Sequence, residues 1–474
     1  MNLFHQIAQF WQTKILNSFG SEKTLLELIQ MGDIGRARDM MQNRDFEVDE
    51  AIKEYNPELH DVKKRPNKYR EGQEPYYTEK LPRGRQRYIN EVETFFLLGQ
   101  NIMWKATSED TDTAFAAYMD FLKMTRFNAT MREAKRLAGA ETESAKVYHI
   151  YQEDGQPRVK VKVISRSKGY TLRPLIDEWG NMTAFGYGYF LKEGNNTVEH
   201  FDIETADYIY RCKATTLGWE VNPIPNPSGK INVIYYRQDK AWRGVQERID
   251  REEMIDSKGA DSNNYFADPK LKVTADIVSL QGGGASNSVG EVIQMSSDTS
   301  KVEYLVPPEY STMKEAEKKD LADSILFDSF TPNFSFENLK GLGTLSGEAL
   351  KRAMVLGYMK RDNLKETYDE MVDREKNLII AIMRNVMNIP LSEELSRLEI
   401  EHEFSEPFAE DKETQREQIA TLYEKGLISL DTAIEMLAIV DKPEEEKRKI
   451  EEEKAARVSI IEPTVNIDPN NNNS

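Results

Sequence analysis

The sequence predicts an α+β protein in which a block of helices precedes an antiparallel sheet. Up to residue 139, apolar residues recur at the spacing of helices that each bury one face. Between residues 147 and 236 the period shortens to two, and Gly, Pro, Asn and Asp separate the apolar segments. Helical spacing returns after residue 239. Strands and helices are thus segregated along the chain, which argues against the alternating order of a parallel α/β sheet.

Composition excludes several classes of protein. The 474 residues, roughly three domains' worth of chain, carry 63 Lys and Arg against 81 Asp and Glu, a net charge of −18. A protein that grips nucleic acid presents a basic surface instead. The single cysteine, Cys212, excludes an intrachain disulfide and, with only five scattered histidines, argues against a zinc site. No run reaches 18 apolar residues, so we expect no membrane span and a protein made in a reducing cytoplasm.

Helices are predicted at several places before the first strand. An amphipathic helix over 1–20 would cover a neighbouring element, because its polar face lacks the Lys and Arg of a membrane-surface helix. Further helices are expected within 22–56, at 89–104 and, as a pair, within 111–139, where Asn128 would cap the second. The strands that follow are expected at 147–151, 159–164, 185–191, 208–212 and 231–236.

Basic residues are concentrated between residues 63 and 88, where tyrosines are interleaved. A segment of this composition can bind nucleic acid through its cations and aromatic rings. It can also be a solvated or subunit-facing loop that balances acidic residues elsewhere, and we favour this second interpretation. The candidate contact residues are Lys63, Lys64, Arg65, Lys68, Arg70, Arg83, Arg85 and Arg87.

After residue 239, two helices are predicted to bracket a small strand module. The first helix covers 239–266 and ends before Pro269, and the second covers 314–330. Short strands are expected between them, at 272–280 and 301–306.

A long helix is predicted after a loop that contains three glycines, residues 331–347. Ser346 would cap this helix, which would run to Met387. Its length would be on the order of 60 Å, and Gly357 is the position at which we expect a bend.

The C-terminal part is predicted to be a helical hairpin. The first helix covers 414–425 and is followed by Gly426, and Ser429 caps the second helix, 430–437. A third helix would begin at Pro443, and the tail is polar.

The glycine loop is the one candidate for nucleotide chemistry. Residues 341–347, GLGTLSG, approach the pattern G-x-G-x-x-G. No strand is predicted before them, the third glycine position holds Ser346, and Glu348 stands where a Walker motif has lysine. No hydrolase or metalloprotease motif occurs, and Cys212 is expected to be a buried, inert thiol. We therefore predict no catalytic residue, no metal and no cofactor.

Two segments resemble the portal proteins of long-tailed bacteriophages. Residues 336–351, FENLKGLGTLSGEALK, are similar to the family's loop and to the S-G-x-A-L-K start of the helix after it. Residues 422–432, LYEKGLISLDT, and 440–446, VDKPEEE, are similar to the family's C-terminal G-I-S-x-E-T and D-P-x-x-E motifs, although Lys442 here separates Asp from Pro. A weaker match covers 89–100, and the order of elements fits the family over nearly the whole chain.

The resemblance implies an elongated portal subunit with regions named wing, stem, clip and crown. The wing would comprise residues 1–238 and the long helix 348–390, the stem the helices 239–268 and 314–330, the clip 269–313, the tunnel loop 331–347, and the helical crown with its tail 391–474.

The resemblance also implies a function. Twelve subunits usually form a ring at one capsid vertex, a head–tail connector through which terminase packages the double-stranded DNA genome and from which the genome is later ejected. Expected partners are further copies of the chain, the terminase large subunit, head-completion or adaptor proteins, the major capsid protein, scaffold and the DNA in the channel, with no membrane. The protein would be assembled in the host bacterial cytoplasm and reside in the virion.

The tunnel loop would be the narrowest part of the channel. Its DNA-facing residues would be Phe336, Glu337, Asn338, Leu339, Lys340, Gly341, Leu342, Gly343 and Thr344. A loop with one Glu, one Lys and three Gly can deform around a moving duplex without binding it strongly, and we expect Lys340 and Asn338 to make transient contacts. Two alternatives remain at this point: a nucleotide-binding enzyme that uses Gly341–Gly347, and a structural adaptor of the virion without a pore.

Overall fold

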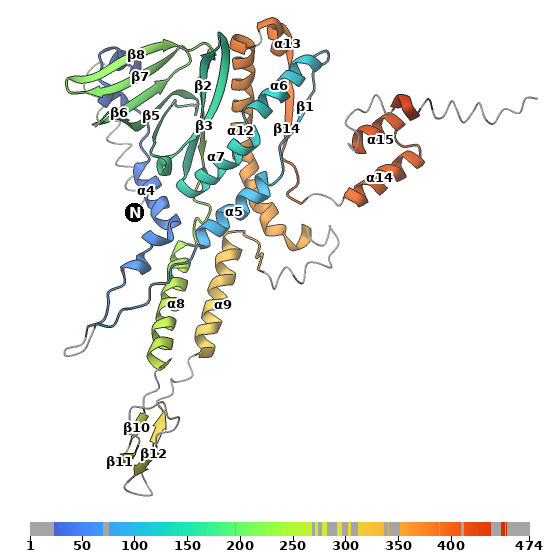
Figure 1. Ribbon diagram of the computed structural model, residues 1–474. Helices are drawn as coiled ribbons and strands as arrows, with labels where there is room; N and C mark the ends of the chain where they lie inside the picture. The colour runs from blue at the N-terminus through green and yellow to red at the C-terminus, as the bar shows by residue number, and fades with distance from the viewer. Residues whose placement is uncertain are drawn as a thin grey trace, which may run out of the picture. The chain divides into compact units, whose positions relative to one another are not determined.

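The chain divides into two compact units, of which the larger holds most of the ordered secondary structure. The computed structural model describes residues 23–69, 75–194, 196–267, 271–273, 277–281, 292–295, 302–304, 311–335, 340, 351–387, 389–408, 412–437, 447–450 and 452 (Figure 1). The larger unit comprises 1–340 and 354–407, and the smaller one comprises 341–353 and 408–474.

Short helices open the described chain: α2 (Leu25–Gln30), α3 (Ile34–Asp39) and α4 (Asp45–Tyr55). A capping box starts α2, because Thr24 Oγ1 accepts from the Glu27 N–H at 3.3 Å and the Glu27 carboxylate accepts from the Thr24 N–H at 2.8 Å. These helices confirm the prediction for 22–56. The helix predicted over 1–20 lies outside the described residues.

The next helices are α5 (Arg85–Leu98), α6 (Asp112–Met124) and α7 (Phe127–Glu141). The prediction of a helix to residue 104 is wrong, because Met103–Ala106 forms strand β1, which pairs with the distant strand β14 (Ile400–Glu403). The prediction that Asn128 caps α7 is also wrong. Arg126, in the left-handed conformation, occupies that position, and Asn128 instead accepts from the Ile102 N–H at 3.4 Å.

Two antiparallel sheets follow, with the orders β3–β2–β9 and β4–β5–β6–β7–β8. Their strands are β2 (Glu143–Glu153), β3 (Gln156–Ile164), β4 (Thr171–Ile176), β5 (Met182–Glu193), β6 (Asn196–Glu204), β7 (Tyr208–Thr215), β8 (Gly218–Pro225) and β9 (Val233–Arg237). All five predicted strands are present. The sequence pattern does not predict β4, β6 and β8. Exposed residues interrupt the apolar alternation of β6 and β8, and the buried Arg173 and Pro174 interrupt that of β4.

The two sheets face each other and are covered on both outer sides by helices. Phe185 and Tyr187 of β5 pack between the sheets, against Val147 of β2. On the other face of β5, a Cβ at Gly186 would lie 2.6 Å from Phe201 and 2.8 Å from the Met41 sulfur, so glycine lets α3 and its following turn approach. Figure 1 draws α7 and α12 on the side of the three-stranded sheet that faces away from β5–β8.

Two helices that lie side by side, α8 (Gln246–Ala267) and α9 (Ser311–Asp328), extend from the rest of the larger unit in Figure 1. Ile249 of α8 and Ile325 of α9 pack with Trp242 and with Ile89 of α5 in one apolar cluster. Between the helices, the described residues of the strand module form four short strands: β10 (Leu271–Val273), β11 (Ile277–Gln281), β12 (Val292–Met295) and β13 (Val302–Tyr304). β10 pairs with β13 and β11 with β12, so the module has more strands than the two predicted.

The long helix is α12 (Val355–Ile382), followed by a π-helical turn at Met383–Met387, a 3-10 turn at Ile389–Leu391 and α13 (Ser392–Arg397). A turn at Met354 separates α12 from the helical residues 351–353. Residues 391–407 belong to the larger unit, because Leu395, Leu398 and Phe404 enter the core that α5, α6, α7, α12 and the three-stranded sheet share. Residues 391–407, the predicted start of the crown, thus share the core of the larger unit.

The smaller unit contains α14 (Lys412–Glu424) and α15 (Leu430–Leu437). Gly426 has φ +68° and ends the first helix, and Ser429 Oγ accepts from the Thr432 N–H at 3.2 Å, as predicted for the hairpin. None of the described helices combines the length and apolarity that a bilayer span requires.

Candidate functional site

The predicted tunnel loop, 331–347, follows α9, and its first residues contact Tyr88 of α5. The Tyr88 hydroxyl donates to the Pro332 carbonyl and accepts from the Phe334 N–H, each at 2.8 Å. Thr331 is buried, and its hydroxyl lies 2.9 Å from that of Ser329. Burial raises the pKa of Tyr88, which keeps the hydroxyl protonated and able to serve both contacts.

The chain returns from this loop to the same helix. α12 passes so close to α5 that a Cβ at Gly357 would lie 2.3 Å from Cζ of Phe96. Phe96 is buried, stacks on Phe334 at 6.3 Å between ring centroids, and meets Tyr358 edge-on at 5.6 Å. One buried ring of α5 thus contacts residues on both sides of the loop.

Gly357 lies in the first turn of α12, just after the turn at Met354. The bend predicted at Gly357 stays a prediction. The structure shows a separate reason why this position requires glycine: any side chain there would displace Phe96.

A buried carboxylate fixes the C-terminal half of α12. Glu375 accepts from Lys146 at 2.7 Å, from Tyr236 at 2.6 Å and from the Tyr148 hydroxyl, and all four side chains are buried. Burial lowers the pKa of Lys146, and the adjacent Glu375 opposes that shift. The strands β2 and β9 therefore present three donors to one carboxylate of α12.

A second buried carboxylate fixes the N-terminal half of α12. Glu93 of α5 forms ion pairs with Lys135 of α7 and with Lys360 of α12, the latter at 3.1 Å, and accepts from Gln238 at 2.8 Å. Burial raises the pKa of Glu93, but the two ammonium groups outweigh it and bring the pKa to about 2. Tyr368 donates to the other end of Gln238 at 2.6 Å.

These contacts set the register of α12. Lys360, Tyr368 and Glu375 are spaced eight and seven residues apart, so they lie on one face of the helix. A shift of one turn would separate every pair and leave charges buried without partners. The two sides of the loop are thus joined to a helix pair whose relative position is fixed.

Residues 75–85, which we call the strap, run along α8. Asp261 accepts from the Glu79 N–H at 2.7 Å, and Ser257 accepts from the Leu81 N–H at 3.0 Å. Glu253 then accepts from the Arg83 N–H at 2.7 Å. As the residue numbers of the strap rise from 79 to 83, those of its partners on α8 fall from 261 to 253, so the strap and the helix are antiparallel.

Most of the predicted basic contact residues are paired with acidic groups of the same chain. Arg85 forms a bidentate pair with Glu252 at 2.7 and 2.9 Å, Arg83 pairs with Asp256, and Arg65 lies 2.8 Å from Asp261. The other pairs are Lys63 with Glu58 at 3.2 Å, Lys64 with Asp61 at 2.7 Å, and Lys68 over the Tyr76 ring at 5.9 Å. Arg87 is exposed, and Arg70 lies outside the described residues. This arrangement supports the interpretation of a segment that balances acid elsewhere over that of a nucleic-acid patch.

His60 joins the strap region to α8 as well. Its Nδ1 lies 2.7 Å from Glu253 and its Nε2 lies 2.7 Å from the Glu54 carbonyl, so both nitrogens face acceptors. Burial lowers the pKa of His60, but the hydrogen bond and the charge of Glu253 outweigh it and raise the pKa above its usual value. The geometry is that of an imidazolium.

The DNA-facing residues predicted from the sequence are almost all beyond the described chain. Phe336, Glu337, Asn338, Leu339, Gly341, Leu342, Gly343 and Thr344 lie outside the described residues, and Lys340 is exposed. What the structure adds is the pair of attachment points on α5 that bound the loop.

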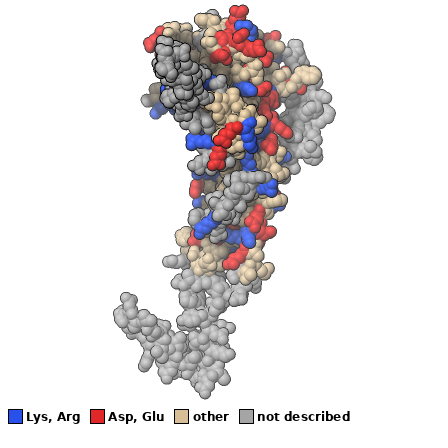
Figure 2. Space-filling model, turned by 90° about the vertical axis from the view of Figure 1, so that its right-hand side faces the viewer, with Lys and Arg blue, Asp and Glu red and all other residues tan. Residues whose placement is uncertain are grey.

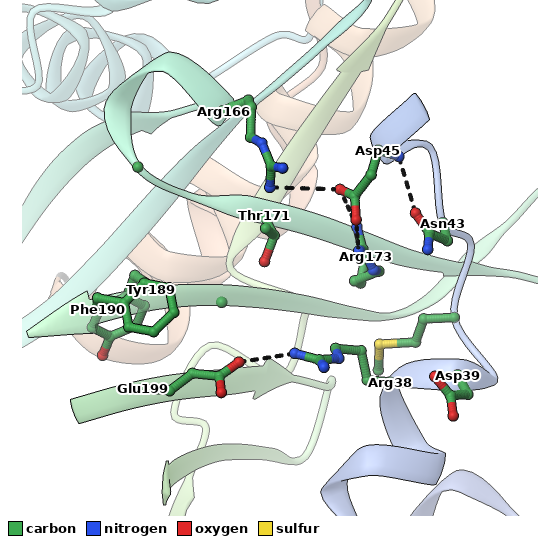
Figure 3. A pocket seen from close by; sticks show the side chains of 13 residues that line it. Arg38, Asp39, Asn43, Asp45, Arg166, Thr171, Arg173, Tyr189, Phe190 and Glu199 are labelled. Atoms are coloured by element: carbon green, nitrogen blue, oxygen red, sulfur yellow. Dashed lines mark hydrogen bonds and ion pairs between the residues drawn. The ribbon is translucent and has the colours of Figure 1, made fainter. Parts of the chain in front are cut away.

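A cavity of about 650 Å³ lies beside the helix-covered face of the five-stranded sheet (Figure 3). Three arginines line it, and each faces a carboxylate. Arg38 lies 2.9 Å from Glu199, Arg166 lies 3.1 Å from Asp49, and Arg173 pairs with Asp45. Each of these three arginines already has a carboxylate partner, so none is left to pair with a phosphate group. This argues against a nucleotide site here.

Two other predictions about chemistry can be compared with the structure. Cys212 is buried, and burial raises its pKa to about 12, which makes the thiol inert, as predicted. In the part of the chain that the structure describes, no group of three or more His, Cys, Asp or Glu could hold a metal ion.

The comparison with protein families decides the class of the protein. Residues 39–459 match the profile of a family described as "Phage portal protein, SPP1 Gp6-like". The chain belongs to this family. It is a portal protein, a structural component of the virion at the head–tail connector, and the alternative of a nucleotide-binding enzyme is wrong.

Other comparisons add little to the family assignment. No curated protein matches the chain. Among solved structures, a chain described as "Neck of native GTA particle computed with C12 symmetry" is similar, with a TM-score of 0.39 and 10% identity over 76% of this chain and 91% of that chain.

Sequence reasoning missed the residues that hold the portal loop. Glu93 interrupts the apolar stretch 89–98, and a charged residue within such a stretch is a signal of a buried ion pair. Glu375 carries no such signal, because it lies in the charged run 373–376, DREK. Tyr88 and Phe96 carry no comparable signal, because their partners at the loop lie far along the chain.

Proposed function

We propose that this portal protein assembles into a ring of twelve subunits at one capsid vertex, and that the genome passes through the ring during packaging and ejection. The observation that carries the proposal is the attachment of the loop 331–347 to α5 on both sides, through Tyr88 and Phe96. These contacts hold Pro332, Phe334 and the start of α12, so copies related by a ring axis would present the segment between them at equivalent positions around one channel.

We also infer the regions of the subunit. The wing would comprise the residues before α8 together with α12 and the residues up to 407, and the core shared by α5, α6, α7, the three-stranded sheet, α12 and residues 395–404 supports this. The stem is α8 with α9, the clip is the strand module between them, and the crown starts at Phe408. The clip would face terminase during packaging and head-completion or adaptor proteins afterwards, while the major capsid protein and scaffold would surround the wing.

Lys340 and Asn338 would make transient contacts with DNA. Lys340 is exposed, and a single cation per subunit is enough to attract a phosphate without arresting the duplex. Particles assembled with Lys340→Ala should package and retain less DNA than wild type, measured as the fraction of DNA-filled heads. Lys351→Ala, another exposed lysine, which lies in the smaller unit, is the control. Equal filling by wild type and Lys340→Ala would remove Lys340 from the proposal.

The ring itself is tested by negative-stain electron microscopy and mass photometry of the full chain. We expect rings with a central hole and a mass near twelve times 54.6 kDa. Monomers, or particles without a hole, would contradict the proposal and favour an adaptor without a pore. ATP and GTP should leave the unfolding temperature unchanged.

A further inference from the structure

The larger unit exposes two strands whose charges are opposite and equally spaced. On β3, Arg158, Lys160 and Lys162 point away from the core and alternate with Val159, Val161 and Val163, and we call these three cations the basic stripe. Along β14 and the residue before it, Glu399, Glu401 and Glu403 are exposed and alternate with Ile400 and His402, and we call these three carboxylates the acidic stripe. Successive charges in each stripe are about 7 Å apart, because alternate residues of a strand share a face.

Both stripes point away from the same core. Val159 and Val163 of β3 and Ile400 of β14 are buried in the core around α12, so the charged residues between them lie on the opposite face of each strand. On β3 this is the face of Val147, whose register partner is Lys162, and the three cations are exposed there. In Figure 1, α12 stands between β3 and β14. Acidic side chains gather at the upper end of the face that Figure 2 shows, the end at which Figure 1 draws α13.

The chain itself neutralises the two stripes only in part, with exposed Lys105 of β1 as the cross-strand partner of Glu401. Over the described residues, no hydrogen bond or ion pair engages the side chains of Lys160, Glu401 and Glu403. Arg158 faces only Glu153, at 3.7 Å with both side chains about half exposed, and Lys162 meets the Tyr170 ring and hydroxyl. This is unlike the segment 63–87, whose cations are mostly paired within the subunit.

A ring needs two different complementary surfaces on each subunit, because its contacts are head-to-tail. We propose that the basic stripe of one subunit contacts the acidic stripe of the next copy of this chain, an inference that rests on the proposed ring. Three cations and three carboxylates at matching spacing give charge complementarity and define the register of the contact. An open edge strand with lysines also resists pairing with unrelated strands, so the stripe favours the correct neighbour.

Charge reversal tests the contact. Lys160→Glu and Glu401→Lys should each place like charges at every interface, and the subunit concentration at which half of the chains are in rings should rise at least about tenfold. The double variant Lys160→Glu/Glu401→Lys restores opposite charges and should recover ring formation. The matched controls are Lys123→Glu and Asp120→Lys, which reverse an exposed pair on α6 and should assemble like wild type. Mass photometry reads the assembly, and unfolding temperatures verify that each variant is folded.

The outcomes separate this inference from the ring proposal. A wild-type chain that stays monomeric overturns the ring and the interface with it. Wild-type rings that tolerate both single reversals, or a double variant that does not recover, overturn the interface and leave the ring standing. As a direct readout, carbodiimide cross-linking of rings mixed from light and ¹⁵N-labelled subunits should join Lys160 to Glu399, Glu401 or Glu403 between light and heavy chains. Cross-links of this pair only within one chain would also overturn it.

Discussion

Two helix contacts of the portal subunit, that of α12 with the three-stranded sheet and that of α9 with α8, involve charges in opposite ways. The Lys146–Glu375 pair of α12 is fully buried, and Tyr148 and Tyr236 complete its hydrogen bonds. By contrast, the Arg251–Glu317 pair that joins α8 to α9 is about half exposed at 2.7 Å. Breaking a buried pair leaves a buried charge without a partner, so such a pair fixes the position of a helix strongly. Exposed pairs contribute little to the free energy of unfolding. Charges therefore fix α12 firmly on the three-stranded sheet, whereas they contribute less to the contact between α8 and α9.

The largest effect is expected at the buried pair. Glu375→Gln leaves Lys146 charged and buried without a counter-ion, which should lower the free energy of unfolding by about 3–5 kcal/mol. Urea unfolding of the monomer, followed by circular dichroism, measures it. Glu370→Gln, on the same helix but exposed and paired with Arg374, should cost at most about 1 kcal/mol. Similar losses for the two variants would mean that burial does not distinguish the wing.

The pH dependence of the wing is expected to contain a contribution from Glu204. Burial and the nearby Asp202 raise its pKa to about 7, against the opposing Arg211. Because the pKa of Glu204 is raised in the folded state, its carboxyl does not lower the free energy of unfolding below about pH 4.5, where it is protonated in both states. The free energy of unfolding then falls as the pH rises through 7.

Glu204→Gln removes this cost. The variant should match wild type at about pH 4.5 and exceed its free energy of unfolding by on the order of 3 kcal/mol at pH 8, with exposed Glu178→Gln as control. Urea titrations at the two pH values measure it. A stability difference that does not change with pH would show that Glu204 titrates normally.

Substitution of Gly357 should have a smaller effect on the free energy of unfolding, but the direction of the change distinguishes close packing from helix propensity. Helix propensity alone predicts that alanine stabilises a helix by up to about 1 kcal/mol relative to glycine. Because a Cβ at Gly357 would meet Phe96 at 2.3 Å, Gly357→Ala should instead destabilise by about 1–3 kcal/mol.

Two further variants complete this comparison. Gly259→Ala in α8 has open space around its Cβ and should stabilise the protein, and Phe96→Leu should reduce the cost of Gly357→Ala. All are measured by urea unfolding. If Gly357→Ala were as favourable as Gly259→Ala, the close packing of α5 on α12 would be wrong.

The smallest effect is expected in the stem. Arg251→Ala should change the free energy of unfolding by less than about 1 kcal/mol, and high salt should abolish the difference. Lys123→Ala, in an even more exposed pair, is the control. A loss as large as that of Glu375→Gln would show that charges fix α9 on α8 as firmly as they fix α12 on the sheet.

Local patterns predicted much of the fold, and long-range contacts account for what they missed. Helical spacing located α4 to α9, and Gly426 and Ser429 located the hairpin of α14 and α15. The pairing of Met103 with Glu403 could not be predicted, because the two strands are short and lie far apart in the sequence. The same holds for Phe96 and Gly357, where the requirement for glycine arises from a ring on another helix.

The strap has a consequence for the order of folding. Its contacts with α8, and those of the residues just before it, join positions 167 to 196 apart in the chain, as for Arg85 with Glu252 and Arg65 with Asp261. During synthesis the strap therefore leaves the ribosome long before its partner helix, and loop closure over this distance is slow. The carboxylates of α8 gain their partners only when both segments have been made. We expect the strap to stay without its partners until α8 has been made, so that these contacts form well after the strap has left the ribosome.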